Sequence, residues 1–197
     1  MKGDLIMGYT TYFNGSFKFN KPVEDWLTEY IHKFSTTRRM KRDNEKIKEL
    51  FPNWESMCFN GYLGKDGEYF VGGTGFYGQD KDESVINYNG PACTQPGLWC
   101  DWEIDATNNE LVWNEAEKFY YYIDWLEYLI DNFFEPLGYV LNGEVKWEGE
   151  ESEDLGIIHV ENNVIDVSYG VHAYSLSSVD TGDLIAELRS RGYKVTA

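Results

Sequence analysis

The spacing of hydrophobic residues predicts two helices long enough to cover a sheet. Over residues 22–36 apolar side chains recur every three or four positions, and Asn20 and Pro22 mark the start of this helix. The same period over residues 116–136 predicts a second, longer amphipathic helix. The apolar positions are Val23, Trp26, Leu27, Tyr30, Ile31 and Phe34 in the first, and Phe119, Tyr122, Ile123, Leu126, Leu129, Ile130 and Phe133 in the second.

Other segments have a period near two, which is typical of strands buried on one face. Residues 9–19 are rich in aromatic residues and threonine, and Gly15 suggests a bulge or bend. Residues 57–63 and 68–74 flank Lys65-Asp66-Gly67. Because Asp-Gly tolerates the positive φ of a tight turn, these two segments predict a hairpin.

A second hairpin is predicted to join residues 98–104 to 110–114 at Asn108-Asn109. Alternation along the strand places side chains on two faces. One face carries Leu98, Cys100, Trp102 and Ile104, and the other carries Trp99, Asp101, Glu103 and Asp105.

Asp101 and Glu103 beside Trp99 resemble the paired carboxyls and aromatic ring of a glycosidase site. A solvated strand carries such acids as well, so we assign no catalytic residue.

After Gly138 the period of two returns, and residues 139–147, 155–160 and 164–169 predict a three-stranded meander. The loop 148–154 between its first two strands holds five acids, which we expect to face water. Shorter helices are predicted at 43–51 and at about 180–191. In the helix at 43–51, Ile47, Leu50 and Phe51 should face inward.

These elements predict one α+β domain over residues 1–197, in which hairpins and the C-terminal meander form a mainly antiparallel sheet packed by the two long amphipathic helices. The polar segment 76–97 is interpreted as a functional loop. The hydrophobic content of 42% favours folding. We expect a soluble protein, because no apolar run is long enough to span a membrane. The odd number of cysteines, three, and the lack of a secretory signal fit the reducing cytoplasm.

Charge divides the chain unequally. Residues 1–50 hold ten Lys and Arg against seven Asp and Glu, whereas residues 51–197 hold seven against twenty-seven. This excess predicts a partner protein with a basic surface, which the acids would meet by imitating the charge spacing of a nucleic acid. A merely solubilising surface is the plainer interpretation. The predicted partner-binding residues are Glu117, Asp124, Asp131, Glu135, Glu148, Glu150 and Glu151.

A basic cluster at residues 38–42 offers an alternative site. Arginine suits bidentate contacts to phosphate, so this cluster and the 76–97 loop could hold a small anionic ligand such as a nucleotide. The cluster could instead be solvated and only balance the acidic body. Direct binding of nucleic acid is not expected, because the net charge of −17 would repel phosphates. The predicted ligand-binding residues are Arg38, Arg39, Lys41, Arg42, Tyr77, Gln79, Tyr88 and Trp99.

No other motif carries chemistry. Cys93 and Cys100 are separated by six residues, unlike the short paired spacing of zinc ligands, and Cys58 lies elsewhere. No pattern places a histidine beside a thiol to activate it. The segment 72–75 is glycine-rich but lacks the lysine of a phosphate-binding loop. We therefore predict no metal and no cofactor.

Three segments resemble small uncharacterised accessory proteins encoded by phages and prophages: residues 8–15, residues 138–150 and residues 183–195. The resemblance implies a protein that blocks host defence by binding a host protein or by sequestering a small signalling ligand. The leading prediction is a non-enzymatic acidic protein that binds, and in doing so inhibits, a basic partner in the host cytoplasm. The alternatives are a binder of a small anionic ligand and an enzyme of unknown chemistry.

Overall fold

The structure is a computed structural model that describes residues 9–72 and 78–170, together with Gly182 and Ile185. It is an α+β fold, as the sequence predicts. The helices are α1 (Asp25–Ser35), α2 (Asn44–Leu50) and α3 (Tyr122–Leu129). The strands are β1 (Thr11–Phe19), β2 (Met40–Arg42), β3 (Val85–Pro91), β4 (Trp102–Asp105), β5 (Glu110–Trp113), β6 (Leu141–Gly149), β7 (Leu155–Glu161) and β8 (Val164–Tyr169).

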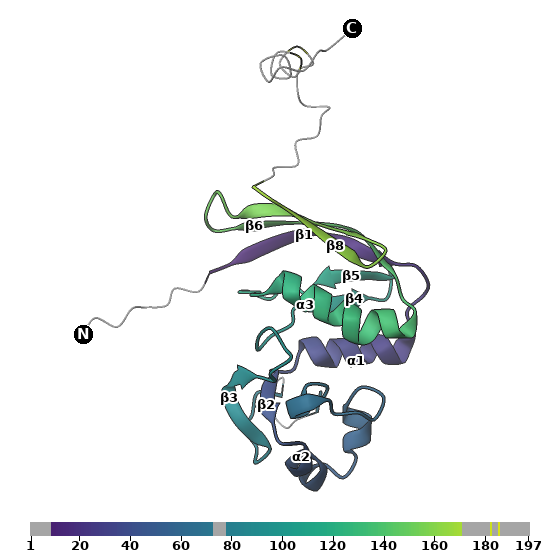
Figure 1. Ribbon diagram of the computed structural model, residues 1–197, viewed down its shortest axis with the longest axis vertical. Helices are drawn as coiled ribbons and strands as arrows, with labels where there is room; N and C mark the ends of the chain where they lie inside the picture. The colour runs from purple at the N-terminus through teal and green to yellow at the C-terminus, as the bar shows by residue number, and fades with distance from the viewer. Residues whose placement is uncertain (1–8, 73–77, 171–181, 183–184, 186–197) are drawn as a thin grey trace, which may run out of the picture.

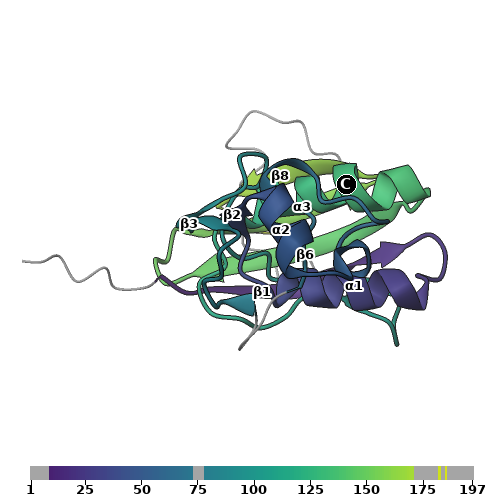
Figure 2. The ribbon, with the colours of Figure 1, turned by 90° about the horizontal axis from the view of Figure 1, so that it is seen from below.

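Six strands form one antiparallel sheet in the order β4-β5-β1-β6-β7-β8, and β2 and β3 form a separate pair. Figure 1 shows α3 and α1 on one face of the large sheet, with α2 and the β2-β3 pair beyond α1. Figure 2, turned by a right angle, shows α1 and α3 running beside each other. Phe34 of α1 meets Trp125 of α3 with ring centroids 5.9 Å apart, which joins the two helices in the main core.

Strands β1 and β6 pair over nine consecutive residues without a register shift, so Gly15 causes no bulge. Gly15 and Gly143 have φ values of +117° and +153°. A Cβ atom on Gly15 would lie 2.2 Å from the carbonyl oxygen of Glu144, and one on Gly143 would lie 2.3 Å from that of Ser16. Glycine is needed at both positions because the two backbones approach each other closely there.

Helix α1 matches its prediction closely. Leu27, Ile31 and Phe34 are fully buried, although the helix begins at Asp25 rather than at residue 22. Trp26 was expected on the buried face but is exposed. The short α2 also forms, with Asp43 accepting hydrogen bonds from two backbone amides at its start, but Leu50 is exposed rather than inward.

The helix predicted over 116–136 is wrong in its first part. Residues 116–121 form a loop, and α3 begins only at Tyr122. After Leu129 the chain continues as a π-helical segment, Ile130–Phe134, and a 3-10 turn, Glu135–Leu137, that ends at Gly138 in the left-handed conformation. Phe119 and Phe133 are buried and lie at helical spacing. The hydrophobic pattern therefore predicts one continuous helix and does not reveal these changes of backbone conformation.

The hairpin predicted over 57–74 does not form within the part of this segment that the structure describes. Lys65–Gly67 makes a 3-10 turn, and residues 57–63 contribute one isolated bridge between Phe59 and Tyr62. Glu68 follows the turn, is buried and accepts hydrogen bonds from the Lys65 N–H and the Tyr128 hydroxyl. These contacts favour the turn over an extended strand that would pair in a hairpin. Leu63 and Phe70 pack instead with Ile47 and Cys58 in a second, smaller hydrophobic cluster.

The remaining predictions hold in part. The meander forms as β6, β7 and β8, and the 98–114 hairpin forms with its first strand starting at Trp102. The segment 76–97 is not wholly irregular, because it contains β3. The helix predicted at about 180–191 lies, except for Gly182 and Ile185, outside the described residues. No helix among the described residues is long and apolar enough to cross a membrane.

Candidate functional site

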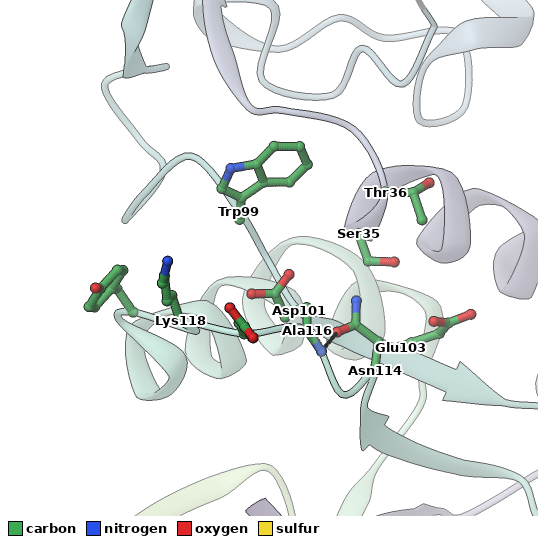
Figure 3. A pocket seen from close by; sticks show the side chains of 10 residues that line it. Ser35, Thr36, Trp99, Asp101, Glu103, Asn114, Ala116 and Lys118 are labelled. Atoms are coloured by element: carbon green, nitrogen blue, oxygen red, sulfur yellow. Dashed lines mark hydrogen bonds between the residues drawn. The ribbon is translucent and has the colours of Figure 1, made fainter. Parts of the chain in front are cut away.

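A cavity of about 590 Å³ lies beside β4, at the edge of the large sheet. Figure 3 shows Trp99 on one side of this cavity, Ser35 and Thr36 on another, and Asp101 directed toward the space between them. Three of its lining residues carry carboxyl groups: Asp101, Glu103 and Glu117. We call it the acidic cavity.

The extension of β4 places two of these carboxyls together. The backbone N–H of Asn114 donates to the carbonyl oxygen of Asp101 at 3.0 Å, which continues the β4-β5 pairing beyond the strand. Asp101 and Glu103 therefore share a face, as the alternation predicts. Glu103 Oε1 lies 2.6 Å from His32 Nδ1 on α1, so one of its oxygens is already engaged.

Asp101 differs from the other two acids in its burial. Only 4% of it is exposed, and burial raises the pKa of its carboxyl to about 7, because desolvation disfavours the charged form. The nearby Asn114 side chain favours the charged form and offsets part of this shift. A buried carboxyl with a raised pKa in a cavity marks a candidate functional site.

The loop between β5 and α3 forms another wall of the acidic cavity. Glu115, Lys118 and Tyr121 have φ values of +65°, +65° and +57°, a conformation that costs most residues roughly 1 kcal/mol. Phe119 anchors the loop, since it is 1% exposed and packs on Trp102. This strained loop holds Lys118 and Tyr120 at the cavity.

A second cavity, of about 440 Å³, adjoins the first, and both are lined by Trp99, Lys118 and Tyr120. Among the described residues, the charged ones that line it are Arg38 and Lys118, so we call it the cationic cavity. The Arg38 guanidinium lies 4.5 Å from the ring centroid of Tyr88 and 5.9 Å from that of Trp99. Three of the predicted ligand-binding residues are thus brought together.

The other predicted ligand-binding residues lie elsewhere. Arg39 and Arg42 are each 2% exposed, so the interpretation of a solvated basic cluster is wrong for both. Arg39 donates to the backbone oxygens of Glu68 and Phe70, Arg42 pairs with Asp82, and Lys41 pairs with Asp66. Gln79 is half-buried and does not line either cavity, and Tyr77 lies outside the described residues.

The predicted partner-binding acids do not form one stripe. Glu117 lies in the loop before α3, whereas Asp124, Asp131 and Glu135 are exposed along α3 and its continuation. Glu148, Glu150 and Glu151 are exposed at the end of β6 and in the loop that follows. Asp154 in this loop is half-buried rather than fully turned to water, and it accepts hydrogen bonds from Tyr9 and Trp147.

One of the predicted acids, Asp131, lines a third depression together with Glu127, which was not among them. A groove of about 420 Å³ runs between α3 and β8, with an apolar floor that includes Ile123, Ile130 and Val167. Glu127 and Asp131 line it, and within the described part of the chain no basic residue does. Strand β8 is at the edge of the sheet, and no other described strand pairs with its outer side.

Sequence reasoning identified Trp99, Asp101 and Glu103 as neighbours but missed Lys118 and Tyr120. These two come from a segment predicted to be helical, and no sequence signal reveals that its backbone turns back toward β4.

A scan against protein-family models finds no match to this chain, and searches of curated proteins and of solved structures find none either. No group of three or more histidine, cysteine or carboxyl side chains in the described part of the chain could hold a metal ion. The three cysteines are free, and Cys58 and Cys100 are buried.

Proposed function

We propose that the protein binds a small anionic ligand with an aromatic ring, such as a nucleotide, in the cationic cavity. One observation carries this proposal. In a chain with a net charge of −17, Arg38 and Lys118 converge on one cavity, and no carboxyl of the described residues lines it. A local concentration of cations against the overall charge favours an anion at this place.

The other walls fit the remainder of such a ligand. Tyr120 and Tyr121 are 49% and 59% exposed, and Trp99 is half-buried, so aromatic faces are available for stacking. The Arg38 side chain is fixed by hydrogen bonds from Nε to the Tyr88 carbonyl (3.1 Å) and from Nη2 to Asn89 Oδ1 (3.3 Å). A donor that is already positioned loses little entropy when it binds phosphate.

Titration calorimetry with adenosine monophosphate (AMP) and adenosine tests this proposal. AMP should bind and adenosine should bind at least tenfold more weakly, because the phosphate contacts are lost. Arg38→Gln and Lys118→Gln should each weaken AMP at least tenfold. Lys18→Gln is the matched control, since it removes the same charge from the solvent-exposed face of β1, and it should leave the affinity unchanged. Equal loss in all three variants would mean that only net charge matters.

The α3-β8 groove favours a second function, the binding of a protein with a basic surface. An extended segment could add to the free edge of β8, set apolar side chains into the groove and pair its cations with Glu127 and Asp131. Val164 beside the groove is 69% exposed and would be covered. Inhibition of a host protein would follow from such an interaction.

A fluorescent peptide of alternating Lys and Val tests this second function. Its affinity should fall as salt rises from about 0.05 to 0.5 M, because salt shortens the Debye length and so screens the attraction between exposed charges. The double variant Glu127→Lys and Asp131→Lys should abolish binding, whereas Glu45→Lys with Glu55→Lys, two exposed acids of the smaller cluster region, should keep most of it. Equal loss in both pairs would refute the groove as the binding site.

A further inference from the structure

The acidic cavity carries an inference about the rest of the ligand. Because Trp99, Lys118 and Tyr120 line both cavities, a ligand large enough to fill both would reach from Arg38 and Lys118 past these residues to Asp101. Any group of the ligand that enters the acidic cavity must therefore suit Asp101.

Asp101 has few hydrogen-bond donors. It is more than nine-tenths buried, and among the described residues the Asn114 side chain is the donor found for its carboxyl. A carboxylate offers about four acceptor positions, so most of those of Asp101 are left for other donors. A ligand that donates hydrogen bonds to Asp101 would fill them.

The other polar groups of the cavity are also suited to hydroxyl groups. The hydroxyls of Ser35 and Thr36 donate to the His32 carbonyl at 3.0 and 2.8 Å, so their oxygens are left to accept. Asn114 Oδ1 accepts from the Ala116 N–H at 3.0 Å, so the Asn114 amide nitrogen is oriented to donate, and it has a second N–H besides the one that serves Asp101. With the face of Trp99 beside them, these groups match a sugar ring, which has polar edges and apolar faces.

A cationic group fits the cavity less well. Lys118 lines the same cavity and would repel it, and Glu103 is engaged by His32. Burial also raises the pKa of Asp101 to about 7, so the carboxyl is partly neutral near neutral pH. A hydroxyl can hydrogen-bond either form of the carboxyl, whereas an ammonium group needs the charged one.

We infer that the ligand is a sugar phosphate of the ribonucleotide type, whose vicinal ring hydroxyls donate hydrogen bonds to Asp101 while its phosphate binds Arg38 and Lys118. This inference rests on the proposed anionic-ligand function, which places the phosphate. It adds that the protein distinguishes ribonucleotides from analogues without ring hydroxyls.

Calorimetric titration with AMP and 2′,3′-dideoxy-AMP tests the inference. The wild-type protein should bind AMP at least tenfold more tightly, because the analogue displaces water from the buried carboxyl without donating hydrogen bonds to it. Asp101→Asn should bind both nucleotides alike, with the dideoxy affinity unchanged from wild type. Asp101→Ala should behave in the same way. It controls for the possibility that the asparagine amide of Asp101→Asn itself hydrogen-bonds the ligand. Asp166→Asn, an exposed carboxyl on β8, is the control and should keep the preference.

The possible failures are distinguishable. If wild type binds the two nucleotides equally and Arg38→Gln loses both, the sugar inference is overturned and the anionic-ligand function stands. A preference for AMP that persists in folded Asp101→Asn and Asp101→Ala also overturns it. If wild type binds neither nucleotide, the proposed function fails and the inference falls with it.

Discussion

Glu68 and Asp101 are both buried carboxyl groups, exposed to 6% and 4%, but their surroundings differ. Glu68 accepts from the Lys65 N–H at 2.8 Å, from the Tyr128 hydroxyl at 3.0 Å and from the Thr94 hydroxyl. Asp101 has one such donor among the described residues, the Asn114 amide. A carboxyl with several protein donors holds structure together, whereas one with few donors at a cavity is available to a ligand.

The same region shows why Glu68 is structural. Its backbone oxygen accepts from Gln95 at 2.7 Å and from Arg39 at 3.2 Å, so side chain and backbone together tie the Lys65–Gly67 turn to residues 94–95 and to α3. Arg39 also lies 4.2 Å above the Phe34 ring, in the main core. Glu68 therefore links the smaller cluster to the larger one, and it lines none of the three depressions described above.

The largest expected effect is a dependence of stability on pH that comes from Asp101. Its pKa is about 7 when folded and near 3.8 when unfolded, so between these values the folded state binds more protons. The free energy of unfolding should therefore fall as pH rises from about 4 to 7, by no more than about 4 kcal/mol. Asp101→Asn should remove this loss and become more stable than wild type above pH 7.

Urea unfolding between pH 4.5 and 8.5 measures this effect as the difference between Asp101→Asn and wild type. The difference should grow with pH. Glu117→Gln is the matched control, because it neutralises an exposed carboxyl of the same cavity, and its difference from wild type should stay flat. A flat difference for Asp101→Asn as well would show that Asp101 is solvated.

The second prediction concerns Glu68. Glu68→Ala should lower the free energy of unfolding by about 3 kcal/mol, because hydrogen bonds to charged groups contribute roughly 1.5 to 3 kcal/mol and the donors around Glu68 would be left buried without acceptors. Urea unfolding at pH 7 measures this loss. A loss below about 1 kcal/mol would contradict the assignment of Glu68 as a structural carboxyl.

The sequence predicts the position of Asp101 on its strand but not the turn conformation around Glu68. Alternation along residues 98–105 predicts that Trp99, Asp101 and Glu103 share a face, because strand geometry is local. The burial of Asp101 depends on α1 and on the loop after β5, which are distant in sequence. Glu68 was assigned to a strand, although the turn chemistry beside it was sound: Asp66 and Gly67 do have positive φ values of 57° and 73°.

The same limit applies to the helices. Helix α1 could be predicted because its apolar face and its backbone are both regular. Over residues 116–137 the hydrophobic period persists while the backbone passes from a left-handed loop through α, π and 3-10 segments. Hydrophobic spacing predicts which side chains are buried, but it does not determine the backbone dihedral angles of the segment. The pattern therefore does not predict the loop that places Lys118 at the cavity.

The smallest expected effect separates one donor from the rest of the Glu68 network. Tyr128→Phe removes the hydroxyl that donates to Glu68 and accepts from Gln95 at 3.3 Å, but keeps the ring packed against Trp125. The free energy of unfolding should fall by about 1 kcal/mol. Tyr120→Phe, which removes an exposed hydroxyl at the cavities, should change it by less than about 0.5 kcal/mol. In the Glu68→Ala background the Tyr128 effect should shrink, since the acceptor is already gone, and a double-mutant cycle measures this coupling. If the two losses simply add, Tyr128 and Glu68 act independently, and the contrast between a carboxyl with several donors and one with few would have to rest on the Lys65 and Thr94 donors alone.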